Sequence, residues 1–279
     1  MKEKKRCAIF CGGALKGAYG AGVASTLIKE LGSDYFHEIR CCSVGFFVSL
    51  FYVSGQPDVM EHVWRELVDS GKLFSFRKIF KGRWPLDLKY LIGIFKIPGP
   101  SYLNAEAVLA SPVKLIVPLA DSRTGENIYR TPQSIEEIYH FMKIAGAVPF
   151  VHGAVRYNGK KYFDGGLTDP IPIPSELDEY SEILIVANKP LNVKDYQGMW
   201  SNKFFSLAFK LTPLYARLIG QYRDRINEVE RLIAEDSRIR IICPNQPLAF
   251  QSIFDSRKEV INASFDIGVR DTKSYLQAQ

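Results

Sequence analysis

The sequence has few cysteines and histidines and no long uninterrupted apolar run. Its 5 cysteines are an odd number at irregular spacing, which excludes a disulfide scaffold, and no pair shows the C-x-x-C spacing of a zinc site. No stretch of about 18 uncharged apolar residues occurs, so no spanning helix is expected. The basic start, Met1 to Arg6, is followed by an apolar run that extends only from Cys7 to Phe10 before glycines interrupt it, which is too short for a signal peptide. We therefore expect a cytoplasmic protein that uses no metal and no cofactor.

The whole chain also has only a small net charge. The 279 residues carry a formal net charge of +6, with 47% hydrophobic and 24% charged residues. This composition excludes a disordered chain, and the lack of a three- or seven-residue period excludes collagen-like and coiled-coil repeats. The charge is too small to indicate nucleic acid by itself and no recognition motif accompanies it, so no nucleic-acid partner is expected.

Apolar periodicity predicts alternating strands and helices in one domain over residues 1–279. Strands are expected at 7–10, 38–42, 113–117, 127–130, 183–187 and 238–243, and Asn158-Gly159 predicts a hairpin. Helices are expected from Gly17 to about Leu31, over 44–53 and 134–146, and from Pro57 through Asp69. The alternation predicts an α/β fold with three αβα layers and a mostly parallel central sheet.

The first chemical motif is a serine between the second strand and the second helix. The run is Cys41-Cys42-Ser43-Val44-Gly45, which keeps most of a G-x-S-x-G nucleophile elbow. Such an elbow is a strained turn that lifts the serine hydroxyl clear of the backbone, and the dipole of the following helix favours negative charge there. The alternative is that Ser43 only caps the helix.

The second motif is a glycine-rich turn between the first strand and the first helix, Gly12-Gly13-Ala14-Leu15-Lys16-Gly17. Its backbone N–H groups are free to face an anion at a helix N-terminus. The spacing matches neither the P-loop nor the dinucleotide-binding pattern. An oxyanion hole, a phosphate cradle and a simple tight turn remain as interpretations.

The third motif, Asp164-Gly165-Gly166, follows the hairpin strand 161–163. Glycines after an acidic residue let the loop pack closely and expose the carboxylate. A plain Asp-Gly turn is the alternative interpretation.

Taken together, these three motifs resemble those of the patatin-like phospholipases, in particular stand-alone bacterial members of about this length. The family patterns G-G-G-x-[KR]-G, G-x-S-x-G and D-G-[GA] correspond in order and spacing to residues 12–17, 41–45 and 164–166. Residues 145–149 and 169–172 resemble the family stretches on either side of the aspartate. The resemblance covers about residues 6–190 and becomes looser over 191–279, where helices and strands are expected.

The resemblance implies a serine lipid acyl hydrolase of the phospholipase A type, with phospholipid or another acyl-ester lipid as substrate. It implies a catalytic dyad of Ser43 and Asp164 without histidine, and an acyl-enzyme intermediate. Gly12, Gly13 and Ala14 would form the oxyanion hole. The supporting residues would be Lys16, Gly17, Gly45, Gly165 and Gly166. None of the 4 histidines lies in a triad-like motif, which agrees with a dyad.

Two residues depart from the family pattern, because Ala14 and Cys41 stand where the family has glycine. A Cβ at either position costs on the order of 1 kcal/mol if φ is positive there. Phe46 and Phe47 also replace small residues and either narrow an acyl pocket or fill the core. Two further functions stay open: a short-chain carboxylesterase or thioesterase, and a lipid- or membrane-binding protein that has lost turnover.

The positive charge is concentrated in two aromatic-rich segments. Residues 72–96 contain seven bases and one acid, and residues 200–223 contain four bases and no acid. Bases interleaved with aromatic residues favour an anionic lipid interface, so peripheral membrane contact is expected through both segments. The alternative is an ordinary basic surface over a normal core.

Overall fold

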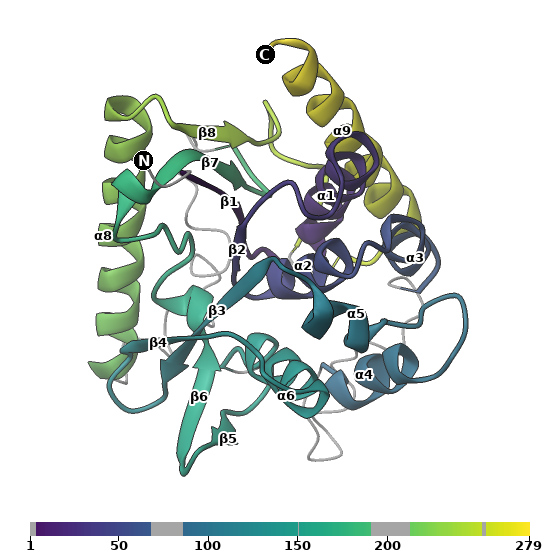
Figure 1. Ribbon diagram of the computed structural model, residues 1–279. Helices are drawn as coiled ribbons and strands as arrows, with labels where there is room; N and C mark the ends of the chain where they lie inside the picture. Colours follow the sequence, from purple (N-terminus) through teal and green to yellow (C-terminus); the bar gives the residue numbers. More distant parts are fainter. Residues whose placement is uncertain (1–3, 68–85, 150, 191–212, 253–254) are drawn as a thin grey trace.

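The computed structural model describes residues 4–67, 86–149, 151–190, 213–252 and 255–279 (Figure 1). Parts of the two basic aromatic segments, residues 72–85 and 200–212, lie outside the described residues. No helix among the described residues is long and apolar enough to cross a membrane.

An eight-stranded sheet forms the centre of the fold, in the order β5-β6-β3-β2-β1-β7-β8, with β4 paired to β3. The strands β1 (Lys5–Phe10), β2 (Glu38–Cys41), β3 (Lys114–Asp121), β7 (Tyr180–Val186) and β8 (Ile239–Ile242) are parallel neighbours. The carboxyl ends of β1, β2 and β7 therefore meet at one edge, where the register pairs Phe10 with both Cys41 and Val186.

The sheet becomes antiparallel beyond the first half of β3. The outer half of β3 pairs with β4 (Asn127–Arg130) and with β6 (Lys160–Asp164), and β6 pairs with β5 (Val155–Tyr157) as the predicted hairpin. Because β3 continues past the end of β2, it carries the end of β6 to the level of the β2–helix junction. Asp164 pairs with Leu119 of β3.

Most helices cover one face of the sheet. They are α1 (Gly17–Leu31), α2 (Val44–Val53), α3 (Pro57–His62), α4 (Leu88–Lys96), α5 (Ala105–Ala110), α6 (Ile135–Ala145) and α9 (Lys258–Gln277). The helices α1 and α9 pack at close range because each has a glycine that faces the backbone of the other. A Cβ at Gly22 would lie 2.1 Å from the Phe265 carbonyl oxygen, and one at Gly268 would lie 2.2 Å from that of Tyr19.

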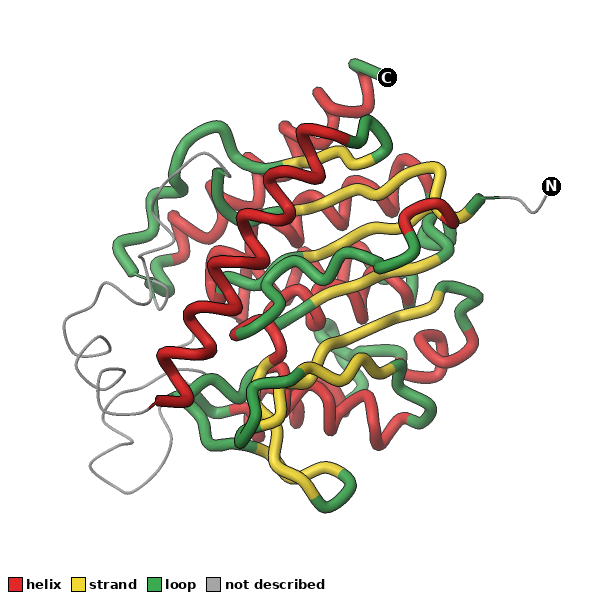
Figure 2. The backbone as a smooth tube through the Cα atoms, turned by 90° about the vertical axis from the view of Figure 1, so that its left-hand side faces the viewer, coloured by secondary structure: helices red, strands yellow, loops and turns green. Residues whose placement is uncertain are grey.

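The helix α8 (Pro213–Glu235) covers the other face, together with Ile171 and Ile173 from the loop after β6. Figure 2 shows α8 crossing in front of the strands. Ile226 and Val229 of α8 pack on the β1 and β7 side chains Cys7, Ile9, Ile183 and Ile185. The α/β fold with helices on both faces of a mostly parallel sheet is thus confirmed.

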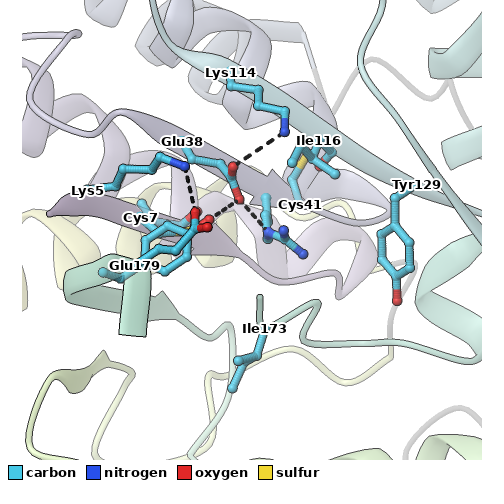
Figure 3. Close-up of polar contacts among 12 residues, drawn as sticks. Lys5, Cys7, Glu38, Cys41, Lys114, Ile116, Tyr129, Ile173 and Glu179 are labelled. Atoms are coloured by element: carbon cyan, nitrogen blue, oxygen red, sulfur yellow. Dashed lines mark hydrogen bonds and ion pairs between the residues drawn. The ribbon is translucent and has the colours of Figure 1, made fainter. Parts of the chain in front are cut away.

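Charged residues gather at the amino ends of the strands, away from the edge where β1 and β2 end. The carboxylate of Glu38, 3% exposed, accepts hydrogen bonds from Arg40 Nε at 2.6 Å and from the Tyr180 hydroxyl at 2.9 Å. Figure 3 shows Glu38 facing Lys114, and Lys5 facing Glu179. The burial of Glu38 is thus offset by direct partners, which assigns this cluster to the fold rather than to chemistry.

Several element boundaries differ from the sequence-based expectations. The helix that begins at Pro57 changes at Val63 to a π-helical turn over Val63–Leu67, and β3 runs four residues further than predicted, to Asp121. No bounds were predicted for α4, α5, α8 and α9, although helices and strands were expected over residues 191–279. These helices gain their place through packing against other elements.

Candidate active site

Ser43 lies at the junction of β2 and α2, at the carboxyl edge of the sheet. Its backbone has φ 53° and ψ −132°, a conformation that L-residues rarely adopt, and its side chain makes no capping hydrogen bond to α2. The capping alternative is therefore wrong, and the turn has the shape of a strained elbow. Gly45 is required there, because a Cβ at this residue would lie 2.1 Å from the Phe10 carbonyl oxygen.

Asp164 ends β6 and lies beside Ser43. Its Oδ1 accepts hydrogen bonds from the backbone N–H of Ser43 at 3.1 Å and from that of Gly166 at 2.9 Å. Asp164 is only 3% exposed. The chain reaches this position by passing close to β3, since a Cβ at Gly165 would lie 2.3 Å from the Pro118 carbonyl oxygen.

The environment of Asp164 changes its acidity. Burial raises the pKa of this carboxyl from 3.8 to about 6, although hydrogen bonds from the Gly166 N–H and from the side chain and N–H of Ser43 act in the opposite direction. A carboxylate with a pKa near 6 is ionised at neutral pH and is a better proton acceptor than an ordinary aspartate. This matches what a general base for a serine hydroxyl requires.

The glycine-rich turn lies against Ser43. A Cβ at Gly12 would lie 2.9 Å from the Ser43 Cβ and 3.6 Å from Oγ, so only backbone fits beside the hydroxyl. The N–H of Gly12 faces the Cys42 thiol and lowers its pKa, whereas burial raises the pKa of that thiol more strongly. Within the described part of the chain, the N–H groups of Gly13 and Ala14 have no acceptor. Two free donors therefore lie in the turn next to the serine, whereas the N–H of Gly12, expected to be a third oxyanion donor, faces the Cys42 thiol.

The sequence model of the patatin-like phospholipases matches residues 8–177, which span β1 through the loop after β6. The chain belongs to the patatin-like phospholipase family. No curated protein sequence matches the chain significantly. Among solved structures, VipD from Legionella pneumophila is similar, with a TM-score of 0.57 and 13% identity over 99% of this chain and 67% of that one. At this identity the likeness supports the fold alone.

The two departures from the patatin pattern have different structural consequences. Ala14 has φ 50°, so its Cβ is strained in the left-handed region. Cys41 ends β2 without a positive φ and is fully buried, with its thiol facing the Ile116 carbonyl oxygen at 3.5 Å. Only the first replacement therefore carries backbone strain. Phe46 of α2 is fully buried in the core, which favours the core-filling interpretation of that residue.

The other residues expected to support the site lie where the two turns meet. The backbone N–H of Lys16 donates to Gly13 O at 3.1 Å and closes the glycine-rich turn. A Cβ at Gly17 would lie 2.7 Å from Val44, and one at Gly166 would lie 3.0 Å from the Cys42 sulfur. Small residues thus allow α1, α2 and the loop after β6 to converge on Ser43.

Two polar residues at this edge of the sheet were missed as site components. Asn188 follows β7 and hydrogen bonds to the glycine-rich turn. Asp169, named only as part of a family stretch, is 4% exposed and accepts hydrogen bonds from Arg225 Nε of α8 at 2.9 Å and from the Tyr129 hydroxyl at 2.6 Å. The place of Asn188 in the sequence could have indicated it, because it directly follows a predicted parallel strand whose end meets those of β1 and β2.

Three of the 4 histidines have hydrogen-bond partners outside this site. His37 Nδ1 accepts from the Arg6 N–H, His140 Nε2 lies 2.8 Å from Arg156 O, and His152 Nδ1 lies 2.8 Å from Gly153 O. Among the described residues, no group of three or more His, Cys, Asp or Glu side chains is arranged to hold a metal ion.

Proposed function

We propose that the protein is a serine lipid acyl hydrolase in which Ser43 and Asp164 form the catalytic dyad. The observation that carries this proposal is the contact between them: a buried carboxylate with a raised pKa is hydrogen-bonded to a serine in a strained elbow. The free N–H groups of Gly13 and Ala14, in the turn beside Gly12, supply the oxyanion hole. Family membership supports an acyl-ester lipid, such as a phospholipid, as substrate.

The first half of the reaction forms an acyl-enzyme. Asp164 accepts the proton of Ser43 Oγ as the oxygen attacks the ester carbonyl. The carbonyl oxygen becomes an oxyanion that the loop N–H groups stabilise, an interaction typically worth about 3–4 kcal/mol per donor. Collapse of the tetrahedral species breaks the ester bond, and the leaving alcohol takes the proton from Asp164.

The second half releases the acid. Asp164 accepts a proton from water, whose oxygen attacks the acyl carbonyl and forms a second oxyanion in the same loop. When this species collapses, Ser43 Oγ leaves and recovers its proton from Asp164. The products are the free fatty acid and the regenerated serine.

Labelling with a fluorophosphonate probe tests the proposal directly. Wild-type protein is expected to label at Ser43, and Ser43→Ala is expected to lose both the label and ester hydrolysis while it stays folded. Ser49→Ala is a matched control, because Ser49 lies buried in α2 and donates to Gly45 O within that helix. If wild-type protein neither labels nor releases acid from any ester, the lipid-binding alternative replaces the enzyme.

Substrate comparison separates the two enzymatic alternatives. A lipid acyl hydrolase is expected to release fatty acid from phospholipid vesicles, whereas a short-chain carboxylesterase or thioesterase would act on short p-nitrophenyl esters or thioesters and leave vesicles intact. Ser43→Ala serves as the blank for both substrates.

We also propose that the site works at an anionic membrane surface. Of residues 72–96, the described part contains α4, which buries Leu88, Ile92 and Phe95 and exposes Lys89 and Lys96. The following Ile97 is 66% exposed beside a shallow hollow of about 410 Å³ lined mainly by apolar surface, with Tyr90 and Ile94 in its wall. Exposed bases beside exposed apolar side chains suit an anionic lipid interface.

Vesicle co-sedimentation tests the membrane proposal. Binding is expected to need anionic lipid, to weaken with salt, and to fall several-fold in Ile97→Asp and Lys89→Glu. Lys161→Glu in the β5–β6 hairpin is the control for loss of one exposed lysine. Equal binding by all three variants would contradict a role of α4.

We further infer that residues 1–279 act as one domain. The part beyond residue 190 contributes β8 to the sheet and α9 to the helix layer on α1. It also contributes Arg225, which reaches the loop after Asp164. Removal of this part is therefore expected to abolish folding rather than leave an active core. Soluble, active protein from residues 1–190 would overturn this inference.

A further inference from the structure

Asn188 lies at the carboxyl end of β7, beside the glycine-rich turn. It is 4% exposed, and every polar group of its side chain has a partner. Nδ2 donates to Cys11 O at 2.9 Å and to Gly12 O at 3.0 Å, and Oδ1 accepts from the backbone N–H of Gly20 in α1 at 3.0 Å. One amide thus joins the turn after β1 to the first turns of α1.

The two carbonyl groups that Asn188 binds belong to the peptide planes that carry the next N–H groups. In a trans peptide the C=O and N–H bonds point in opposite directions. Holding Gly12 O toward Asn188 therefore points the Gly13 N–H away from it, and holding Cys11 O does the same for the Gly12 N–H. The Gly12 N–H indeed faces Cys42, the neighbour of Ser43.

We propose that Asn188 is a positioning residue that sets the orientation of the oxyanion-loop peptides. This inference rests on the function proposed above and adds a residue outside the three sequence motifs. The turn contains glycine at 12 and 13, so its peptides rotate easily unless something holds them. Gly13 has φ 145°, which only that freedom permits. The double donation from Asn188 supplies the restraint.

The space around the amide is fully used, which makes the restraint rigid. A Cβ at Gly13 would lie 3.3 Å from the Asn188 Cβ, and one at Gly20 would lie 2.9 Å from Oδ1. Gly20 therefore lets Asn188 approach α1 closely enough to accept its N–H. A side chain at Gly20 would push the amide toward the turn and disturb the same peptides.

Asn188→Asp is the sharpest test, because it keeps the shape and an oxygen for Gly20 but replaces both donors with an acceptor. We expect kcat on a soluble ester to fall about 100-fold, with KM within about two-fold of wild type. Affinity for a trifluoromethyl ketone analogue, which forms an oxyanion on Ser43, should fall by about the same factor as kcat/KM. Affinity for a non-cleavable ether analogue should not change.

Gly20→Ala provides an independent variant that leaves Asn188 in place, in case Asn188→Asp fails to fold. It is expected to lower kcat at least ten-fold with the same selective loss of ketone affinity. The control is Ser264→Ala in α9, a buried side chain that donates to Val260 O and is expected to keep wild-type kcat.

The outcomes separate this inference from the proposed function. Failure of wild-type protein to label or hydrolyse overturns both. An active wild type with unchanged kcat in Asn188→Asp or Gly20→Ala overturns only the role of Asn188. Equal loss of affinity for the ketone and the ether analogues would also overturn it, because a merely structural defect weakens both.

Discussion

The backbone N–H of Ser43 donates to Oδ1 of Asp164 across 3.1 Å. The carboxylate therefore holds the backbone of the elbow as well as lying beside its hydroxyl. Gly166 N–H occupies the same oxygen at 2.9 Å, so the carboxylate is fixed in one orientation by two backbone donors. The strained turn and the buried charge are thus coupled, and each has a measurable cost to stability.

The strain at Ser43 predicts that glycine stabilises this position. At φ 53° and ψ −132° a side chain costs about 1–3 kcal/mol, which glycine avoids. We expect Ser43→Gly to have a free energy of unfolding about 1 kcal/mol above that of Ser43→Ala, and both variants to be inactive. Urea denaturation measures the difference. Equal stabilities would show that the elbow is unstrained in solution.

The buried charge of Asp164 predicts that its removal stabilises the protein at neutral pH. Its pKa is raised from 3.8 to about 6, so the folded state binds a proton more tightly than the unfolded state. The cost of burying the charge is absent below pH 4, grows as the pH rises through about 6, and is complete above it. The free energy of unfolding of Asp164→Asn should therefore exceed that of wild type by on the order of 3 kcal/mol at pH 8. At pH 4 the two free energies of unfolding should be equal.

Asp121→Asn is the control of opposite sign for this measurement. Hydrogen bonds from the backbone N–H groups of Arg123 and Thr124 lower the pKa of Asp121. This carboxylate therefore stabilises the fold above its unfolded pKa, and that contribution is lost as the pH falls through its folded pKa. Asp121→Asn should lower stability at pH 8. If both variants shift stability in the same direction, the burial argument for Asp164 is wrong.

The same pKa predicts the pH dependence of activity. Because Asp164 must be ionised to accept the serine proton, kcat/KM on a neutral, soluble ester should rise with pH about a midpoint near 6 and then level off. A soluble substrate keeps changes in vesicle charge out of the measurement. A midpoint near 4 would mean that the carboxyl is solvated during catalysis, and one near 8 would indicate another base.

Ala14 predicts a gain of stability on return to glycine. Its φ of 50° is strained for a side chain, although glycine also gains freedom in the unfolded chain. We expect Ala14→Gly to raise the free energy of unfolding by about 0.5–1 kcal/mol and to keep kcat within a few-fold of wild type. Thermal unfolding and hydrolysis assays test this. Ala18→Gly in α1, a buried helical position, is the control and should be destabilising.

The ion pair between Asp169 and Arg225 predicts a large cost when only one partner is removed. Arg225→Met leaves a carboxylate that is 6% exposed with the Tyr129 hydroxyl as its remaining side-chain donor, so we expect a loss of about 3 kcal/mol. The double variant with Asp169→Asn should recover much of that loss. Arg231→Met removes an exposed pair with Glu235 on the same helix and should cost less than about 1 kcal/mol. Equal losses of unfolding free energy in Arg225→Met and Arg231→Met would contradict the idea that Arg225 anchors α8 to Asp169.

Local sequence patterns are sufficient to identify the candidate dyad and the glycine-rich turn. The strand-to-helix junctions at Ser43 and Gly12 are visible because glycine and apolar runs act over a few neighbouring residues. The order of the three motifs carries the resemblance to the patatin-like phospholipases, which the family match over residues 8–177 confirms. The catalytic roles of these residues stay predictions until the variants are tested.

The sequence by itself determined which residues have chemical potential, since a serine, an aspartate and glycines at turns are recognisable from their immediate neighbours. Only the tertiary structure decided that Ser43 is strained while Cys41 is not, because φ depends on how a chain leaves its strand. Only the structure also placed Asn188 on the glycine-rich turn and Arg225 on Asp169, over 176 and 56 residues of sequence separation. Contacts of that range arise from the meeting of parallel strand ends and the docking of α8, and no local pattern encodes them.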